Sequence, residues 1–328
     1  MKKNFICMYL FLLATLASCQ SCSSDYKDVD DIVVEGVETP VLLGDPFIML
    51  HDGTYYAYGT HADDGIEVYT SDDLKTWKYK GMALQKKDVW ADRWFWAPEV
   101  YEVNGKFYMY YSADEHICVA TADSPAGPFT QSKKEPMIAD EKCIDNSLFI
   151  DDDGTPYLYF VRFTDGNVIW VAEMNDDLTG IKQETLTECI KVGEPWELSQ
   201  DKPAKVAEGP SILKREDVYY LVYSANHFES KNYGVGYATS NSPMGPWKKY
   251  EGNPILQHAD GLMGTGHGAP FCCKDGSWKY IFHAHWDSTK VQPRTSYIKD
   301  FAISDQGTVS IGGSLIRPQV LGSTSLEK

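Results

Sequence analysis

The sequence predicts an all-β fold, a five-bladed β-propeller whose four-stranded antiparallel blades surround a central pocket. The first observation is that pairs of β-rich runs, mostly joined by an Asp-Gly or Asn-Gly turn, occur five times. Such turns are strong hairpin signals. The second observation is the period, because the repeats begin near residues 45, 97, 145, 208 and 267, at spacings of 52, 48, 63 and 59. Four-strand units at this period are typical of propeller blades. A β-sandwich is the alternative fold, since turn spacing alone also fits it.

Each repeat supplies the strands of one blade. The expected strand pairs are 47–50 with 55–58, 99–101 with 107–111, 147–150 with 157–160, 206–213 with 219–224, and 269–271 with 278–282. A third strand follows each pair, for example at 66–71 and 234–240. A fourth segment carries Thr76-Trp77, Gly127-Pro128-Phe129 or Gly245-Pro246-Trp247. In a propeller the innermost strands begin at the central pocket, so we expect the residues at the blade starts to converge there.

The first 19 residues have the pattern of a bacterial export signal. Lys2 and Lys3 precede an apolar run over 5–16, which is too short to span a bilayer as a helix. Leu16-Ala17-Ser18-Cys19 resembles the lipobox of bacterial lipoproteins, which implies acylation of Cys19 and a lipid anchor as the only membrane attachment. We therefore expect a signal peptide over 1–19, a flexible tether over 20–38 and a single propeller domain over 39–328. The expected location is a bacterial membrane, facing the periplasm or the cell surface.

Composition narrows the class of partner. The net charge of −17 argues against nucleic acid, because phosphate binding needs a basic face. The hydrophobic share of 43% is enough for a large core, and the aromatic share of 13% provides rings on which sugars can stack. The cysteine spacings match no zinc pattern, so we expect mostly buried thiols and leave any disulfide pairing open.

Three carboxylates stand at equivalent points of the repeat. Asp45, Asp145 and Glu208 each lie at or next to the start of an expected innermost strand. A single acid at such a point is most simply a turn residue or a solvated side chain. Three acids from three blades facing one hole favour a catalytic centre.

At these positions the chain resembles glycoside hydrolase family 43. The motifs that carry the resemblance are Asp45-Pro46-Phe47, Trp96-Ala97-Pro98-Glu99, Ile144-Asp145-Asn146-Ser147 and Ala207-Glu208-Gly209-Pro210-Ser211. The resemblance covers nearly the whole chain after the tether, from Gly44 through Arg294. In this family the second Asp is often followed by Pro, and here Asn146 takes that place. The resemblance implies a five-bladed propeller with Asp45 as general base, Glu208 as general acid, and Asp145 as the residue that orients the acid and modulates its pKa.

Inversion at a glycosidic carbon needs an acid to protonate the leaving oxygen and a base to activate water on the opposite face. The carboxyl groups of such a pair stand about 6.5–9.5 Å apart. A retaining mechanism, which needs about 5–5.5 Å, is the alternative. The acid must hold a proton at working pH, so the pKa of Glu208 has to be raised by burial or by a nearby negative charge.

Several further residues are candidates for substrate binding. Phe47 and Trp96 flank the first two blade starts, His227 follows a blade strand together with Phe228, and the resemblance places Arg294 against the sugar hydroxyls. Trp90, Trp94, Phe95 and Trp96 form a dense aromatic cluster that we expect at the mouth of the pocket. His267 starts the fifth blade. The resemblance implies no required cofactor, and calcium near His267 is the one ion it suggests.

The function most consistent with these features is an inverting exo-acting glycosidase on plant cell-wall glycans, with arabinose- or xylose-containing substrates. We favour an α-L-arabinofuranosidase. The alternatives within the family are a β-xylosidase, an endo-arabinanase or xylanase, and an exo-galactosidase. A catalytically inactive glycan-binding lipoprotein is the alternative from another class.

Overall fold

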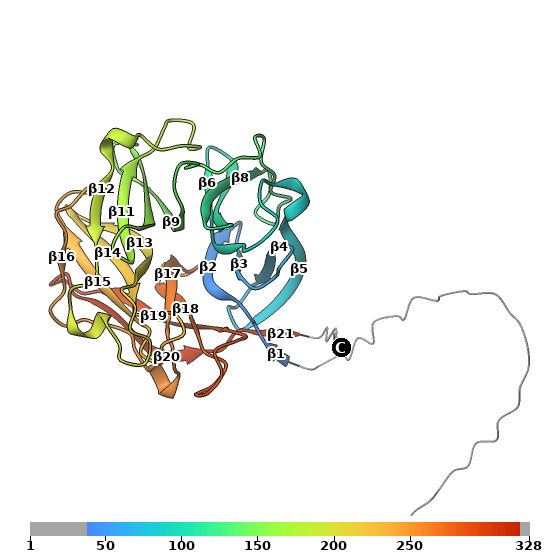
Figure 1. The fold of residues 1–328 in the computed structure, drawn as a ribbon. Helices are drawn as coiled ribbons and strands as arrows, with labels where there is room; N and C mark the ends of the chain where they lie inside the picture. Colours follow the sequence, from blue (N-terminus) through green and yellow to red (C-terminus); the bar gives the residue numbers. More distant parts are fainter. Residues whose placement is uncertain (1–37, 322–328) are drawn as a thin grey trace, which may run out of the picture.

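Five antiparallel sheets stand side by side around one axis in the computed structural model, which describes residues 38–321 (Figure 1). In each sheet the first strand of the repeat lies innermost and the later strands follow outward. Blade 1 contains β2 (Gly44–His51), β3 (Thr54–Thr60), β4 (Gly65–Ser71) and β5 (Thr76–Gln85), and blade 2 contains β6 (Trp96–Val103), β7 (Lys106–Ala113) and β8 (His116–Ala122). Blade 3 contains β9 (Cys143–Ile150), β10 (Pro156–Phe163), β11 (Asn167–Glu173) and β12 (Thr187–Ile190), and blade 4 contains β13 (Ala207–Arg215), β14 (Val218–Ala225), β15 (Gly234–Ser240) and β16 (Lys248–Lys249). Blade 5 contains β17 (Gly266–Cys272), β18 (Trp278–Ala284), β19 (Thr295–Ile303) and β20 (Val309–Ile316). The predicted five-bladed propeller is confirmed.

The hairpin turns form where the sequence predicts them. Asp52 and Gly53 have φ values of 45° and 73°, and Asn104 and Gly105 have 53° and 75°. Two consecutive residues with positive φ make the tight turn whose twist matches that of the flanking strands. Short turns of this kind fix the register of β2 with β3 and of β6 with β7, and thereby decide which residues start each innermost strand.

Blades 1 and 2 depart from the expected four strands. Strand β21 (Gln319–Leu321) pairs in parallel with β5, and β1 (Glu38–Pro40) pairs in antiparallel with β21. The two ends of the described chain thus close the ring at the outer edge of blade 1 (Figure 1). Blade 2 has three strands. The predicted fourth segment at Phe129 bridges Leu84 of blade 1, because the Phe129 N–H donates to Ala83 O and the preceding Pro128 has no N–H to give.

One apolar cluster fills each junction between neighbouring blades. Tyr58 and Phe107 lie between blades 1 and 2, Tyr110 and Phe160 between blades 2 and 3, and so on around the ring. The remaining clusters join blades 3 and 4, blades 4 and 5, and blades 5 and 1. Apolar side chains are therefore buried between neighbouring sheets, and polar residues can occupy the central axis.

The expected signal peptide, Cys19 and the tether up to residue 37 lie outside the described residues. Four short 3-10 helices occur in the connections between 38 and 321: η1 (Lys86–Asp88), η2 (Gln183–Thr185), η3 (Pro195–Glu197) and η4 (Ala259–Gly261). Within that range no helix has the length and apolar character needed to cross a membrane. The five cysteines there are free thiols, with Cys118, Cys143 and Cys273 buried.

Candidate active site

The three predicted acids line one pocket of about 550 Å³ at the end of the ring where the innermost strands begin. This volume lies in the usual range for a small-molecule site of about 300–1,000 Å³. The pocket is also lined by four other residues that the sequence singled out, namely Trp96, His227, His267 and Arg294. Phe47 is not among the lining residues. Its ring packs 5.6 Å from that of Tyr101 and faces a smaller cavity on the axis.

A local kink lies at the start of the innermost strand in every blade. The second residue of the kinked segment has positive φ in all five blades, and the ladder register shifts there. These residues are Asp45, Ala97, Asp145, Gly209 and His267, with φ values of 46°, 44°, 57°, 56° and 39°. A bulge with a left-handed residue re-aims a side chain out of the pleat, and the strain persists only where surrounding contacts hold it.

A hydrogen bond from the preceding blade holds four of these five kinks. In each case the N–H of the kinked residue donates to a side chain near the end of that blade's second strand. The pairs are Ala97 with Thr60, Asp145 with Ser112, His267 with Ser224, and Asp45 with His283, at 2.8–3.0 Å. In blade 3 the corresponding strand position is Val161, which has no acceptor. The Gly209 N–H donates instead to Asp145 Oδ2 at 3.2 Å, and this bond orients the Asp145 carboxylate toward blade 4.

The alignment of Glu208 with Asp45 and Asp145 predicts that Glu208 is itself the kinked residue. In the structure Glu208 lies one residue before the kink. A Cβ atom built on Gly209 would lie 2.9 Å from the ring of His267, and the backbone there has φ of 56°. Only glycine avoids both the clash and the strain, so the acid of blade 4 occupies the preceding position.

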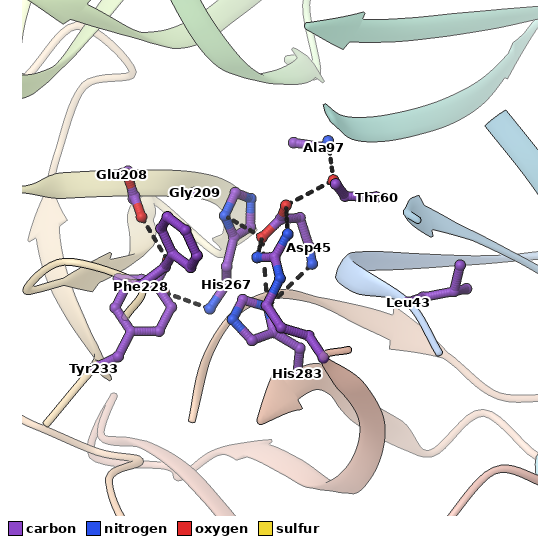
Figure 2. Close-up of polar contacts among 12 residues, drawn as sticks. Leu43, Asp45, Thr60, Ala97, Glu208, Gly209, Phe228, Tyr233, His267 and His283 are labelled. Carbon is purple, nitrogen blue, oxygen red and sulfur yellow. Dashed lines mark hydrogen bonds and ion pairs between the residues drawn. The ribbon is translucent and has the colours of Figure 1, made fainter. Parts of the chain in front are cut away.

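The Asp45 carboxylate is held ionised. Arg294 binds it with both terminal nitrogens, at 2.5 and 2.9 Å. The Thr60 hydroxyl donates to Oδ2 at 2.7 Å (Figure 2). Burial alone would raise the pKa of Asp45, but the Arg294 guanidinium outweighs it and keeps the pKa well below the usual range. Both terminal nitrogens of Arg294 thus contact Asp45, and Arg294 also lines the pocket, so its contact with the sugar hydroxyls stays a prediction.

The two histidines next to Asp45 are neutral. Because the Asp45 N–H donates to Nδ1 of His283, the His283 proton sits on Nε2, and burial holds the pKa of this imidazole well below its usual value. His267 Nδ1 lies 3.2 Å from Asp45 Oδ1 and 3.9 Å from Asp145 Oδ2. Burial lowers the pKa of His267 as well. Arg294 is therefore the fixed positive charge that faces the base.

The pKa values of Glu208 and Asp145 are raised, whereas that of Asp45 is lowered. Burial raises the pKa of Glu208 to about 7, even though Tyr233 Oη donates to Oε1 at 2.8 Å (Figure 2). Asn167 Nδ2 also donates, to Oε2 at 2.9 Å. Burial, with the nearby Glu208 charge, raises the pKa of Asp145 well above its usual value. The two carboxyl groups have oxygen atoms within 4.8 Å of each other, so they titrate as a coupled pair.

Sequence reasoning missed Thr60, Asn167, Tyr233 and His283. Thr60 and His283 lie at or near the end of a second strand, Asn167 starts a third strand, and Tyr233 directly precedes one. In an antiparallel blade these points lie at the same end as the start of the first strand, so the repeat itself carried the signal. Searching that end of every blade for polar residues would have found Thr60 and His283.

The pocket also contains a group that could hold a metal such as calcium. Ligand atoms of Asp145, Glu208 and His267 lie within 4.8 Å of one another. Calcium takes six to eight oxygen ligands, so two carboxylates and one imidazole fit it only if water supplies the rest. A metal bound to Glu208 would also take the place of its proton. Of the two carboxylates, Asp145 is thus the one better suited to hold an ion.

Glu99 is a fourth acid near the axis, and it lines the smaller cavity. Its carboxyl pairs with the Tyr101 hydroxyl, and burial raises its pKa to about 8. The folded protein therefore binds a proton here between about pH 4.5 and pH 8 that the unfolded chain releases, so this group's contribution to stability falls as pH rises through that window.

Replacing Glu99 with Gln should remove this dependence. Each pKa unit corresponds to about 1.4 kcal/mol, so we expect Glu99→Gln to gain up to about 4 kcal/mol in unfolding free energy relative to the original protein at pH 8.5. At pH 4.5 the two proteins should unfold alike. Urea unfolding at both pH values checks this, and an equal change at both would show that Glu99 is already ionised.

Comparisons with known proteins agree with this architecture. The model of the family described as glycosyl hydrolases family 43 matches residues 38–309. A solved structure described as endo-1,4-beta-xylanase from Bacteroides thetaiotaomicron VPI-5482 is 63% identical, has a TM-score of 0.84, and aligns over 87% of this chain and 99% of that one. A beta-D-galactofuranosidase of Aspergillus niger is 27% identical over 296 residues, 82% of each protein. An extracellular exo-alpha-(1->5)-L-arabinofuranosidase of Cellvibrio japonicus is 26% identical over 312 residues, 84% of each.

Proposed function

The chain belongs to glycoside hydrolase family 43, and we propose that it hydrolyses arabinose- or xylose-containing plant glycans with inversion, using Asp45 as general base and Glu208 as general acid. The observation that carries the proposal is that the environment shifts the pKa values of Asp45 and Glu208, in one pocket, in opposite directions. Asp45 is held ionised by Arg294, whereas burial keeps a proton on the pair formed by Glu208 and Asp145. Two acids whose environments push their pKa values apart are suited to the base and acid roles.

Each residue then has a defined step. Asp45 accepts a proton from the water that attacks the anomeric carbon, and Glu208 donates its proton to the leaving oxygen. The base and the acid therefore act on opposite faces of the sugar ring. Tyr233 and Asn167 hold the Glu208 carboxyl in place. Asp145 shares the proton of Glu208 while its own orientation is fixed by Gly209.

The sugar and linkage are the finer part of the proposal. The sequence favours an α-L-arabinofuranosidase, and the Cellvibrio relative supports that choice. Xylan cleavage is the second candidate, because the structure described as an endo-1,4-beta-xylanase is 63% identical. Incubating the purified protein with arabinoxylan, arabinan, arabinogalactan and xylan, and separating the released sugars by chromatography, decides between them. Proton NMR of the first product gives its anomer. Retention of configuration, or no release from any of the four, would contradict the proposal.

We expect the pH profile of kcat/KM to have one limb in the accessible range. Activity should fall above about pH 7, where the Glu208–Asp145 pair loses its proton, and Asp45 should give no acidic limb because it stays ionised. In Tyr233→Phe the carboxylate loses a hydrogen bond that favours its ionised form. The alkaline limb should therefore move up by about 0.5–1 pH unit. Asn167→Ala should move it in the same direction, and a downward shift in either variant would be inconsistent with these hydrogen bonds.

We also propose that the protein is exported and lipid-anchored through Cys19. Detergent phase partitioning of the full-length protein tests this, since Cys19→Ser should move it from the detergent phase to the aqueous phase.

A further inference from the structure

A second chamber of about 230 Å³ opens beside the catalytic pocket, and none of the roles above uses it. The two spaces share four lining residues, which are Thr60, Trp96, Gln292 and Arg294. We call this space the side chamber. The two spaces are therefore adjacent, and a ligand bound in one would lie next to a ligand bound in the other. The volume of the side chamber is well below half that of the catalytic pocket, which suits one ring-sized unit.

Two tryptophans form one wall of the side chamber. The rings of Trp94 and Trp96 are stacked, with centroids 5.7 Å apart and an interplanar angle of 14°. Trp94 remains 44% exposed and has φ of 57°, an uncommon backbone conformation for so bulky a residue. The guanidinium of Arg93 lies 4.3 Å from the centre of the Trp94 ring and is bound to Asp114 at 2.8 Å. An exposed aromatic side chain that neighbouring groups hold in a strained conformation is typical of a ligand-binding surface.

Polar groups line the same space. The Asp63 carboxylate and the Gln292 amide are among them, and both residues are exposed. An aromatic wall beside a carboxylate and an amide suits a neutral ligand that is rich in hydroxyl groups. A further sugar residue has this chemistry.

The side chamber lies on the side of the base. Thr60 and Arg294, which line it, both bind Asp45, whereas Glu208 and its partner Asn167 line only the main pocket. In Figure 2 Thr60 and Glu208 lie on opposite sides of Asp45. The leaving group departs toward the acid. A sugar in the side chamber is therefore joined to the unit being cleaved and not to the leaving group.

We propose that the side chamber is a subsite for a second sugar residue on the non-leaving side of the scissile bond, with Trp94 as its main determinant. This inference rests on the proposed function. It makes the enzyme most efficient when the cleaved unit carries a further sugar. This favours cleavage within a chain, as in the second candidate above, over the trimming of single terminal residues by an α-L-arabinofuranosidase.

The test compares substrates that differ only on that side. Aryl β-xyloside and aryl β-xylobioside have the same leaving group, as do the aryl α-L-arabinofuranoside and its (1→5)-linked disaccharide analogue. In the sugar series that the enzyme cleaves, we expect kcat/KM to be at least about tenfold higher for the disaccharide substrate, equivalent to about 1.4 kcal/mol. Trp94→Ala should bring this ratio close to one, and Trp94→Phe should keep part of it. Gln292→Ala should lower it as well, because Gln292 also lines the side chamber.

Trp278→Ala is the matched control, because Trp278 is 41% exposed but lies at the start of β18, outside the lining of both spaces. It should leave the ratio unchanged. A ratio near one in the unmodified protein, or a ratio that Trp94→Ala does not alter, would overturn the proposal. So would a loss confined to substrates extended on the leaving-group side. If no substrate is cleaved, the proposed function fails separately, and calorimetric affinities of mono- and disaccharides for the protein and for Trp94→Ala then decide the subsite.

Discussion

Glu208→Gln is expected to slow hydrolysis of natural glycans by about 10²–10⁴, the contribution typical of a positioned general acid. The glutamine keeps the size of the side chain and an acceptor for the Tyr233 hydroxyl, so the fold should persist. What it loses is the proton that the leaving oxygen needs. An aryl glycoside with a strongly acidic phenol needs little protonation, and its turnover should fall by less than about tenfold. Steady-state kinetics on both kinds of substrate measure the difference.

The pH dependence gives a second readout for this variant. With the titrating carboxyl gone, the alkaline limb near pH 7 should disappear for the aryl glycoside. Glu115→Gln is a suitable control, because Glu115 also lines the pocket but its carboxylate is paired with Lys142. Glu115→Gln should change the turnover of the natural glycan and of the aryl glycoside by the same small factor. Equal losses on both substrates in Glu208→Gln would show that Glu208 is not the acid.

The blade starts could be predicted because they depend on local signals. Hairpin turns and a repeat of about fifty residues placed Asp45 and Asp145 at the axis from residues alone, and the structure brings both into one pocket with Glu208. The offset of Glu208 could not be predicted in this way. It follows from the contact between Gly209 and His267, which joins residues 58 positions apart in sequence across two blades.

The partners of the acids were harder to find, since they depend on contacts between blades. Asp145 binds Gly209 because Val161 of blade 3 offers no acceptor, and one hydrophobic residue in a strand gives no sign of that role. Tyr233 lies in a connection just before β15, where sequence patterns say least about direction. The side chamber depends on the same kind of information: the aromatic cluster around Trp94 was visible in the sequence, but not its position next to Arg294.

Asp45→Asn should abolish activity on every substrate, whatever the leaving group. The amide cannot accept a proton from water, so we expect kcat to fall by at least about 10²–10⁴ for glycans and for activated aryl glycosides alike. This pattern separates the base from the acid, whose loss an activated leaving group partly offsets. A strong recovery on the activated substrate would contradict the assignment of Asp45.

The same substitution should also destabilise the fold, because it leaves the buried Arg294 guanidinium without its counter-ion. Removing one member of a buried ion pair costs about 3–5 kcal/mol. The double variant Asp45→Asn with Arg294→Leu removes both charges, so we expect it to recover most of the unfolding free energy in urea while its activity stays absent. If the double variant were as unstable as the single one, the loss would come from the shape of the site and not from the uncompensated charge. If it regained activity, proton transfer to Asp45 could not be the step that the single variant lacks.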